Sequence, residues 1–201
     1  MLMNELIQFV EDKSFDISND WYFHATRNDI NIIKKILDEG IKASCFRKEK
    51  GSHFNGKYYI SLYDRVDYDL NAFYIFYPKF VIDDINPLYA DSNKFSQRLR
   101  YSNTILPFRT SQWNGEYQQF LKISPEKIVA LRYDLSIVFD MLYSSDEFVL
   151  ETLKKENLIF LRKIVLSLNE LNKDLPIYDL STCREINKEK MLSLRLDDKF
   201  I

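Results

Sequence analysis

Three short segments of the chain carry the side chains best suited to chemistry. His24 ends the run Trp-Tyr-Phe-His, Tyr59 follows Gly-Lys-Tyr, and Glu116 follows Asn-Gly. An imidazole can form hydrogen bonds, an aromatic ring can stack on a flat ligand, and a carboxylate can stabilise a developing positive charge. Each residue also has a structural interpretation: a hydrogen-bonded histidine at a strand end, a packed core tyrosine and a solvent-facing glutamate. Their chemistry depends on the elements that position them.

The strands that must hold these residues are predicted from short apolar and aromatic runs. They cover residues 21–24, 58–62, 80–82, 116–123 and 127–133. A turn at Ser124-Pro125 separates the last two strands. The polar residues 42–56 and the irregular residues 83–115 are predicted to be loops, and long loops in compact domains are commonly functional.

Helices are predicted where apolar residues recur at spacings of three and four. Asn28 or Asp29 can cap a helix that runs to about Glu39, and Gly40 follows where a glycine often ends a helix. The predicted buried stripe of this helix consists of Ile33, Ile36 and Leu37. Two further helices are predicted over residues 3–12 and 64–77.

The last third of the chain is predicted to be helical. Ser144 and Glu147 have the spacing of a capping box, and leucine, isoleucine and valine then recur at helical spacing to about residue 172. A shorter helix is predicted over residues 188–196. A helix with a clean apolar stripe usually packs on its own protein, so we expect this region to pack on the preceding domain.

The length and composition fit a globular protein whose core needs neither disulfide bonds nor a bound metal for stability. The chain has 201 residues, and we expect a domain over residues 1–140 and a helical extension over residues 141–201. The net charge of −2 argues against a general nucleic-acid clamp. The two cysteines lie far apart, and they provide neither a disulfide framework nor the spacing of a zinc site.

The first residues carry an early acid and lack the basic and apolar regions of a Sec signal peptide. No stretch of the sequence is apolar enough to predict a membrane-spanning helix. We therefore expect a cytoplasmic protein with no membrane partner. Because secreted effectors can lack a Sec signal, export by another route stays open.

The combination of the three segments resembles the ADP-ribosyltransferase superfamily, in the His-Tyr-Glu branch of the poly(ADP-ribose) polymerases and diphtheria-toxin-like enzymes. The resemblance covers roughly residues 20–133. His-Ala-Thr, a helix and then Gly40-Ile41 are similar to the family's His-Gly-Thr/Ser, helix and Gly-Leu/Ile. This resemblance implies an α+β fold with split antiparallel β-sheets, followed here by the helical C-terminal extension, and it implies NAD as the substrate with no metal.

The first motif implies how part of NAD is held. In the family, the histidine bonds the adenosine-side ribose, the backbone of the next residue grips the nicotinamide amide, and a Ser/Thr hydroxyl helps to hold the dinucleotide. These roles fall to His24, Ala25 and Thr26. Ala25 stands where the family has glycine, and its methyl group narrows the backbone approach that a glycine permits.

The second motif implies how nicotinamide is stacked. The family places a tyrosine in a strand of the pattern Gly-x-Tyr-aromatic-Ala/Ser, and this pattern assigns the stacking ring to Tyr59 and the last position to Ser61. Tyr58 is the alternative, because neighbouring residues of a strand point to opposite faces. A second stacking tyrosine follows on a helix in the family, and Asn-Ala-Phe-Tyr assigns that role to Tyr74.

The third motif, similar to the family's Asn-Glu-Tyr strand, gives Glu116 the central catalytic role. Breaking the bond between ribose and nicotinamide leaves positive charge on the sugar, as in glycosidic transition states. A carboxylate bonded to the neighbouring 2′-hydroxyl binds more strongly as that charge develops. The arginine-modifying branch has a second acid where this chain has Asn114, and an arginine in place of His24. The resemblance therefore disfavours arginine as the acceptor.

The resulting hypothesis is an NAD-dependent mono-ADP-ribosyltransferase that modifies a macromolecular acceptor, a protein rather than a nucleic acid. Residues 42–56 and 83–115 are expected to select that acceptor, and the sequence does not distinguish a toxin from a defence or housekeeping enzyme. Two alternatives stay open. One is a catalytically silent module that keeps the fold and binds a protein or nucleotide. The other is an RNA 2′-phosphotransferase on the same fold, which needs basic residues for the RNA phosphates.

Overall fold

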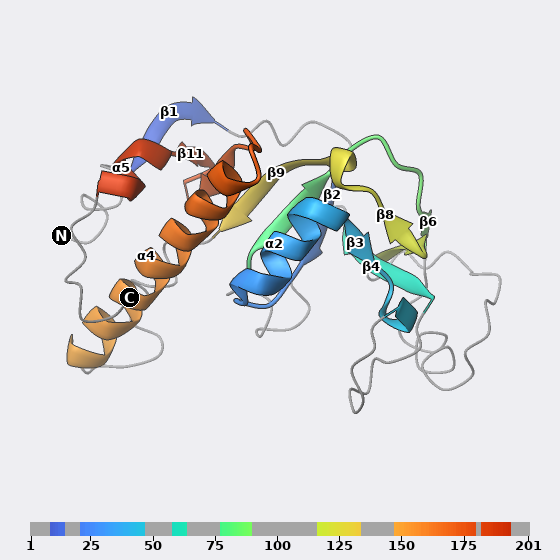
Figure 1. Ribbon diagram of the computed structural model, residues 1–201, viewed down its shortest axis with the longest axis horizontal. Helices are drawn as coiled ribbons and strands as arrows, with labels where there is room; N and C mark the ends of the chain where they lie inside the picture. The colour runs from blue at the N-terminus through green and yellow to red at the C-terminus, as the bar shows by residue number, and fades with distance from the viewer. Residues whose placement is uncertain are drawn as a thin grey trace.

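The protein combines a β-sheet with α-helices (Figure 1). The computed structural model describes residues 9–14, 21–46, 58–63, 77–89, 116–133, 147–179 and 182–193. The strands are β1 (Val10–Ser14), β2 (Tyr22–Ala25), β3 (Ile41–Lys42), β4 (Tyr59–Tyr63), β5 (Lys79–Ile82), β6 (Leu88–Tyr89), β7 (Glu116–Phe120), β8 (Lys122–Ile123), β9 (Ile128–Tyr133), β10 (Ile177–Asp179) and β11 (Arg184–Ile186). The helices are α2 (Ile30–Glu39), α4 (Glu147–Glu170) and α5 (Lys188–Ser193), with short 3₁₀ turns η1 (Ser44–Phe46) and η3 (Pro125–Lys127).

Within the described ranges, nine strands form one sheet in the order β1-β11-β10-β9-β5-β2-β4-β7-β6. Neighbouring strands run antiparallel except β9 and β10, which are parallel. Strands β3 and β8 form a separate two-stranded ladder. The prediction of an α+β fold with mostly antiparallel strands is therefore confirmed.

One face of the sheet packs against α2 and α4, which lie side by side over the strands (Figure 1). We call it the helix-covered face. The core beneath the helices includes Ile33 of α2, Leu168 of α4, and Phe80 and Leu131 of the sheet. Burial of such apolar side chains is the main force that holds the layers together.

We call the other face of the sheet the second face, and the strand register identifies the residues that belong to it. Residues directly opposite each other on paired strands share a face, and successive residues alternate. Phe23, Val81 and Ala130 lie opposite one another across β2, β5 and β9, and they form a small buried cluster of their own. Residues that lie opposite a member of this row, or two positions from one along the same strand, therefore also belong to the second face.

The predicted helix after residue 28 is confirmed as α2, and its capping residue is Asp29. The Asp29 Oδ1 accepts hydrogen bonds from the backbone N–H groups of Asn31 at 2.9 Å and Ile32 at 3.4 Å. Gly40 ends the helix with φ of 83° and ψ of 179°, and its N–H donates to the Ile36 carbonyl. The predicted strands over residues 21–24, 58–62, 80–82 and 127–133 also appear, as β2, β4, β5 and β9.

Three predictions of secondary structure need correction. The predicted helix over residues 3–12 is wrong at its end, because β1 begins at Val10 and pairs with β11. The predicted strand 116–123 is broken into β7 and β8 at Leu121, whose φ of 62° bends the chain. Residues 88–89, expected to be irregular, form the short strand β6. The predicted helix 64–77 falls almost wholly outside the described residues.

The last third of the chain is not purely helical. The long helix appears as α4 and the short one as α5, but β10 and β11 lie between them and extend the main sheet. Each of these strands has only three residues, so neither produces a readable alternation in the sequence. The expected helical extension is therefore corrected to a helical and strand-forming segment. The first residues of the predicted capping box, 144–146, lie outside the described part of the chain.

Replacing Gly40 by alanine is expected to destabilise the protein by at least about 2 kcal/mol. Its φ and ψ lie in a region that is essentially restricted to glycine, where strain costs about 1–3 kcal/mol for other residues. The added Cβ would also overlap the Ile123 carbonyl oxygen of β8. Chemical denaturation measures the loss, and Asp38→Ala, at an exposed site in the same helix, is the matched control. Equal stability of the two variants would contradict this account.

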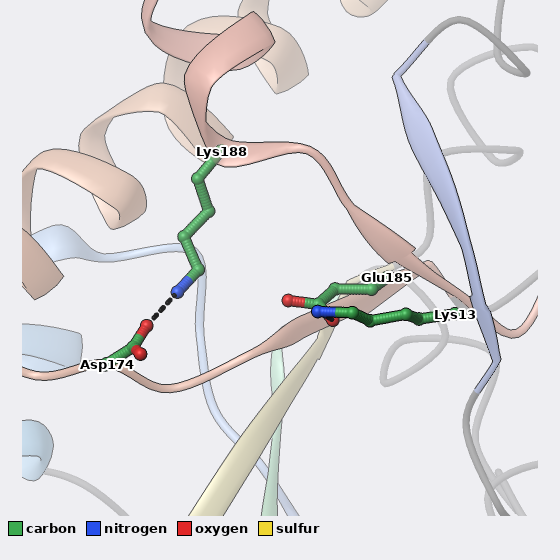
Figure 2. A network of polar contacts seen from close by, with 4 residues as sticks. All are labelled: Lys13, Asp174, Glu185 and Lys188. Atoms are coloured by element: carbon green, nitrogen blue, oxygen red, sulfur yellow. Dashed lines mark hydrogen bonds and ion pairs between the residues drawn. The ribbon is translucent and has the colours of Figure 1, made fainter.

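Two ion pairs lie where β1, β11 and α5 meet (Figure 2). The Lys188 Nζ lies 2.9 Å from an Asp174 carboxylate oxygen, and the Lys13 Nζ lies 3.8 Å from a Glu185 carboxylate oxygen. The hydrogen bond from Lys188, followed by its charge, lowers the pKa of Asp174 below the usual value of 3.8. Exposed pairs of this kind contribute little, and salt weakens them further.

Asp174→Asn is expected to lower the melting temperature slightly at neutral pH and not at strongly acidic pH. Because the folded-state pKa of Asp174 is the lower one, its carboxylate adds stability above a pH of about 3.8, which is lost as the pH falls through the folded-state pKa. Thermal unfolding of wild type, Asp174→Asn and the exposed control Asp38→Asn across this range measures the effect. A difference that persists at the lowest pH would argue against the ion pair as its cause.

Candidate functional site

The strands that carry the three predicted site residues are neighbours in the sheet. His24 lies on β2, Tyr59 on β4 and Glu116 on β7, and the sheet order is β2-β4-β7. Paired strands lie about 4.8 Å apart, so the backbones of β2 and β7 are separated by roughly 10 Å. Segments that are far apart in the sequence are thus brought within reach of a single ligand.

The two sides of β4 are paired very differently. On one side, five residue pairs join β4 to β7, from Tyr59 opposite Phe120 to Tyr63 opposite Glu116. On the other side, the ladder with β2 includes only Phe23 opposite Tyr63 among the described residues. The sheet therefore loosens between β2 and β4, at the strand end that carries His24.

The His24 side chain bridges the two strands where their backbone pairing stops. Its Nδ1 lies 3.0 Å from the backbone carbonyl oxygen of Ser61. A carbonyl oxygen can only accept a hydrogen bond, so Nδ1 must carry the proton. In the neutral ring the lone pair then belongs to Nε2, which is the nitrogen suited to accept from a hydroxyl or amide donor.

The register divides the predicted residues between the two faces. Tyr63 lies opposite both Phe23 and Glu116, so the position of Glu116 belongs to the second face. Alternation along β4 puts Tyr59 on that face as well. His24 instead lies opposite Phe80, which belongs to the helix-covered face. The register therefore separates His24 from Tyr59 and from the position of Glu116, and the contact of His24 with β4 is the one to the Ser61 carbonyl. Only the backbone of Glu116 is described.

The register also separates Tyr58 from Tyr59. Tyr59 is 6% exposed and lies within β4, with the face parity of Glu116. Tyr58 is 36% exposed and precedes the strand, where its carbonyl accepts a hydrogen bond from the Leu121 N–H at 2.9 Å. Between these two tyrosines, Tyr59 is the one within the β4–β7 ladder and on the face of Glu116, although Glu116 lies opposite Tyr63 at the other end of that ladder.

The remaining predicted residues take varied positions. Ala25 lies opposite Lys79 of β5 and is half-buried. Thr26 is buried, and its backbone N–H donates to the Pro78 carbonyl at 2.9 Å. Ala25 is therefore the last residue of β2, and Thr26 follows it. Tyr74 lies outside the described residues.

The structure adds buried polar residues that no sequence motif had marked. Lys79 and Arg132 lie directly opposite each other on β5 and β9, with 5% and 1% of their surfaces exposed. On the same face, Gln118 of β7 is also buried and lies opposite Ser61 of β4. Each stands in a strand next to apolar residues, so only the register reveals that they share the second face. Buried charged and polar groups need partners and are common near functional sites.

The described residues hold no group of three or more His, Cys, Asp or Glu side chains that could bind a metal ion. They also contain no helix with the length and apolar composition needed to cross a membrane. Comparison of the chain with protein-family models, curated proteins and solved structures gives no match. A functional proposal must therefore rest on the motifs and on their arrangement in the sheet.

The bond between His24 and Ser61 predicts the tautomer of the histidine ring. Neutral His24 should carry its proton on Nδ1, because that nitrogen faces a carbonyl oxygen. Two-dimensional ¹H–¹⁵N spectra of the imidazole nitrogens test this, and a His53→Gln variant assigns the two sets of signals. A neutral ring protonated on Nε2 would show that this hydrogen bond does not form.

Proposed function

We propose that the protein is an NAD-dependent mono-ADP-ribosyltransferase with the fold of that superfamily. It transfers ADP-ribose from NAD to a macromolecular acceptor, a protein rather than a nucleic acid, and releases nicotinamide. The observation that supports the proposal is that β2, β4 and β7, the strands that hold the His, Tyr and Glu motifs, are neighbours in the sheet. Their resemblance to the family supplies the reaction.

The proposed reaction exchanges one bond at the anomeric carbon C1′ of the nicotinamide ribose. The bond between C1′ and the nicotinamide nitrogen breaks, and its electron pair stays on nicotinamide, which leaves as a neutral molecule. The acceptor's nucleophile forms the new bond to C1′ and loses its proton to a base or to solvent. Glu116 stabilises the positive charge on the sugar through the 2′-hydroxyl, an interaction that is strongest in the transition state.

The loosened junction between β2 and β4 supports a binding role for this part of the sheet. The His24 ring is oriented by the Ser61 carbonyl, so Nε2 is the nitrogen assigned to the ribose. Tyr59 is assigned to the nicotinamide ring, where stacking on an aromatic face contributes about 0.5–1.5 kcal/mol. Ala25 and Thr26 follow His24 along the chain and would contact the dinucleotide through the backbone and a hydroxyl.

Glu116→Gln is expected to lower the rate of nicotinamide release by about 100-fold or more, while NAD still binds. The substitution keeps the shape of the side chain and removes the charge that stabilises the transition state. Release from isotope-labelled NAD, with and without candidate acceptor proteins, measures the rate. Glu126→Gln changes an exposed acid in η3 and is the matched control.

Two results of this assay would decide against the proposal. One is wild-type protein that neither binds NAD in calorimetry nor transfers label to any acceptor. The other is a Glu116→Gln variant as active as Glu126→Gln.

A catalytically silent binding module on the same fold is the second candidate, and Ala25 is the residue that favours it. The Ala25 methyl group occupies the half-buried position beside Lys79 where the family has glycine. Wild-type protein that binds NAD without releasing nicotinamide, together with tighter NAD binding by Ala25→Gly, would favour this candidate. Nicotinamide release in the absence of RNA would count against an RNA 2′-phosphotransferase.

A further inference from the structure

Gln118 occupies the middle of β7, two residues after Glu116. It lies opposite Ser61 of β4 on one side and opposite Leu88 of β6 on the other. Since residues at i and i+2 of a strand share a face, Gln118 belongs to the second face together with the position of Glu116. Gln119, the next residue, lies opposite Ile60 and belongs to the helix-covered face.

The side chain of Gln118 is unusual because it is buried without being satisfied. Only 1% of its surface is exposed. Its Oε1 has no hydrogen-bond donor within the part of the chain that the structure describes. A buried acceptor without a donor has lost its hydrogen bonds to water and has formed none within the protein. Because this is unfavourable, most buried polar groups in proteins are paired. We therefore expect the hydrogen-bond donor to this oxygen to come from outside the described residues.

The position of Gln118 in the sheet places it among the residues of the site proposed above. Tyr59, Ser61 and Glu116 surround Gln118 on the second face through the ladder between β4 and β7. NAD carries the required donors, because the ribose has O–H groups and the nicotinamide carboxamide has N–H groups. A site that hydrogen-bonds such a group also rejects analogues that lack it.

We propose that Gln118 is a further ligand-binding residue, whose Oε1 accepts a hydrogen bond from a ribose hydroxyl or the carboxamide of the bound dinucleotide. This inference rests on the proposed function for the identity of the ligand. It adds a contact on β7 that the three-residue motif does not contain. It also gives Gln118 opposite effects in the two states. The unpaired oxygen lowers the stability of the free protein, whereas in the complex it strengthens ligand binding.

Gln118→Met tests the inference, because methionine keeps the unbranched shape and removes the amide oxygen. Gln119→Met makes the same change at the adjacent position on the other face and is the matched control. Calorimetry with NAD, nicotinamide and ADP-ribose measures binding, and thermal unfolding without ligand measures stability. We expect Gln118→Met to bind NAD about 5- to 10-fold more weakly, the effect of losing one hydrogen bond. We expect its melting temperature without ligand to be unchanged or higher.

The fragments locate the donor. Weaker binding of NAD and ADP-ribose with unchanged nicotinamide binding would support a ribose hydroxyl. Weaker binding of NAD and nicotinamide with unchanged ADP-ribose binding would support the carboxamide. Equal NAD affinity of Gln118→Met and wild type, or a lower melting temperature of free Gln118→Met than of Gln119→Met, would overturn the inference alone. Wild-type protein that binds none of the three compounds would overturn the proposed function, and with it NAD as the ligand.

Discussion

The pairing of β4 is the constraint on which the candidate site depends. This strand has a continuous ladder to β7 on one side and a nearly open junction with β2 on the other, bridged by the His24 ring. The ladder fixes the register of Tyr59 and Ser61 against Glu116. β4 is therefore joined to β7 by a backbone ladder and to His24 by a side-chain hydrogen bond.

The helices stabilise this arrangement from the far side of the sheet. α2 and α4 cover one face with a continuous apolar core, and the hydrogen bond from Tyr133 to Asn157 joins α4 to β9. Gly40 lets the end of α2 approach the carbonyl of Ile123 in β8. The main core lies on the helix-covered face, whereas the second face combines a smaller apolar cluster with the buried polar residues Lys79, Arg132 and Gln118.

The features predicted correctly from the sequence have strong local signals. Asp29 and Gly40 mark the ends of α2, and aromatic or β-branched runs mark β2, β4, β5 and β9. The features that were missed are set by long-range pairing. β10 and β11 have three residues each, and β1, β10 and β11 are held in the sheet by pairing of β1 with β11 and of β10 with β11 and β9. The motifs named His24, Tyr59 and Glu116, but the face on which each lies depends on the register, which a sequence pattern does not contain.

The placement of β1 and β11 has a consequence for how the chain folds. The first described strand pairs with the last one, and β10 joins β9 only after the chain has passed through α4. A growing chain that has just completed β9 therefore still exposes one edge of the sheet, with neither β10 nor β1 in place. The sheet is complete only after the residues up to Ile186 have been synthesised. This favours slow, late assembly and leaves the incomplete chain prone to association through that edge.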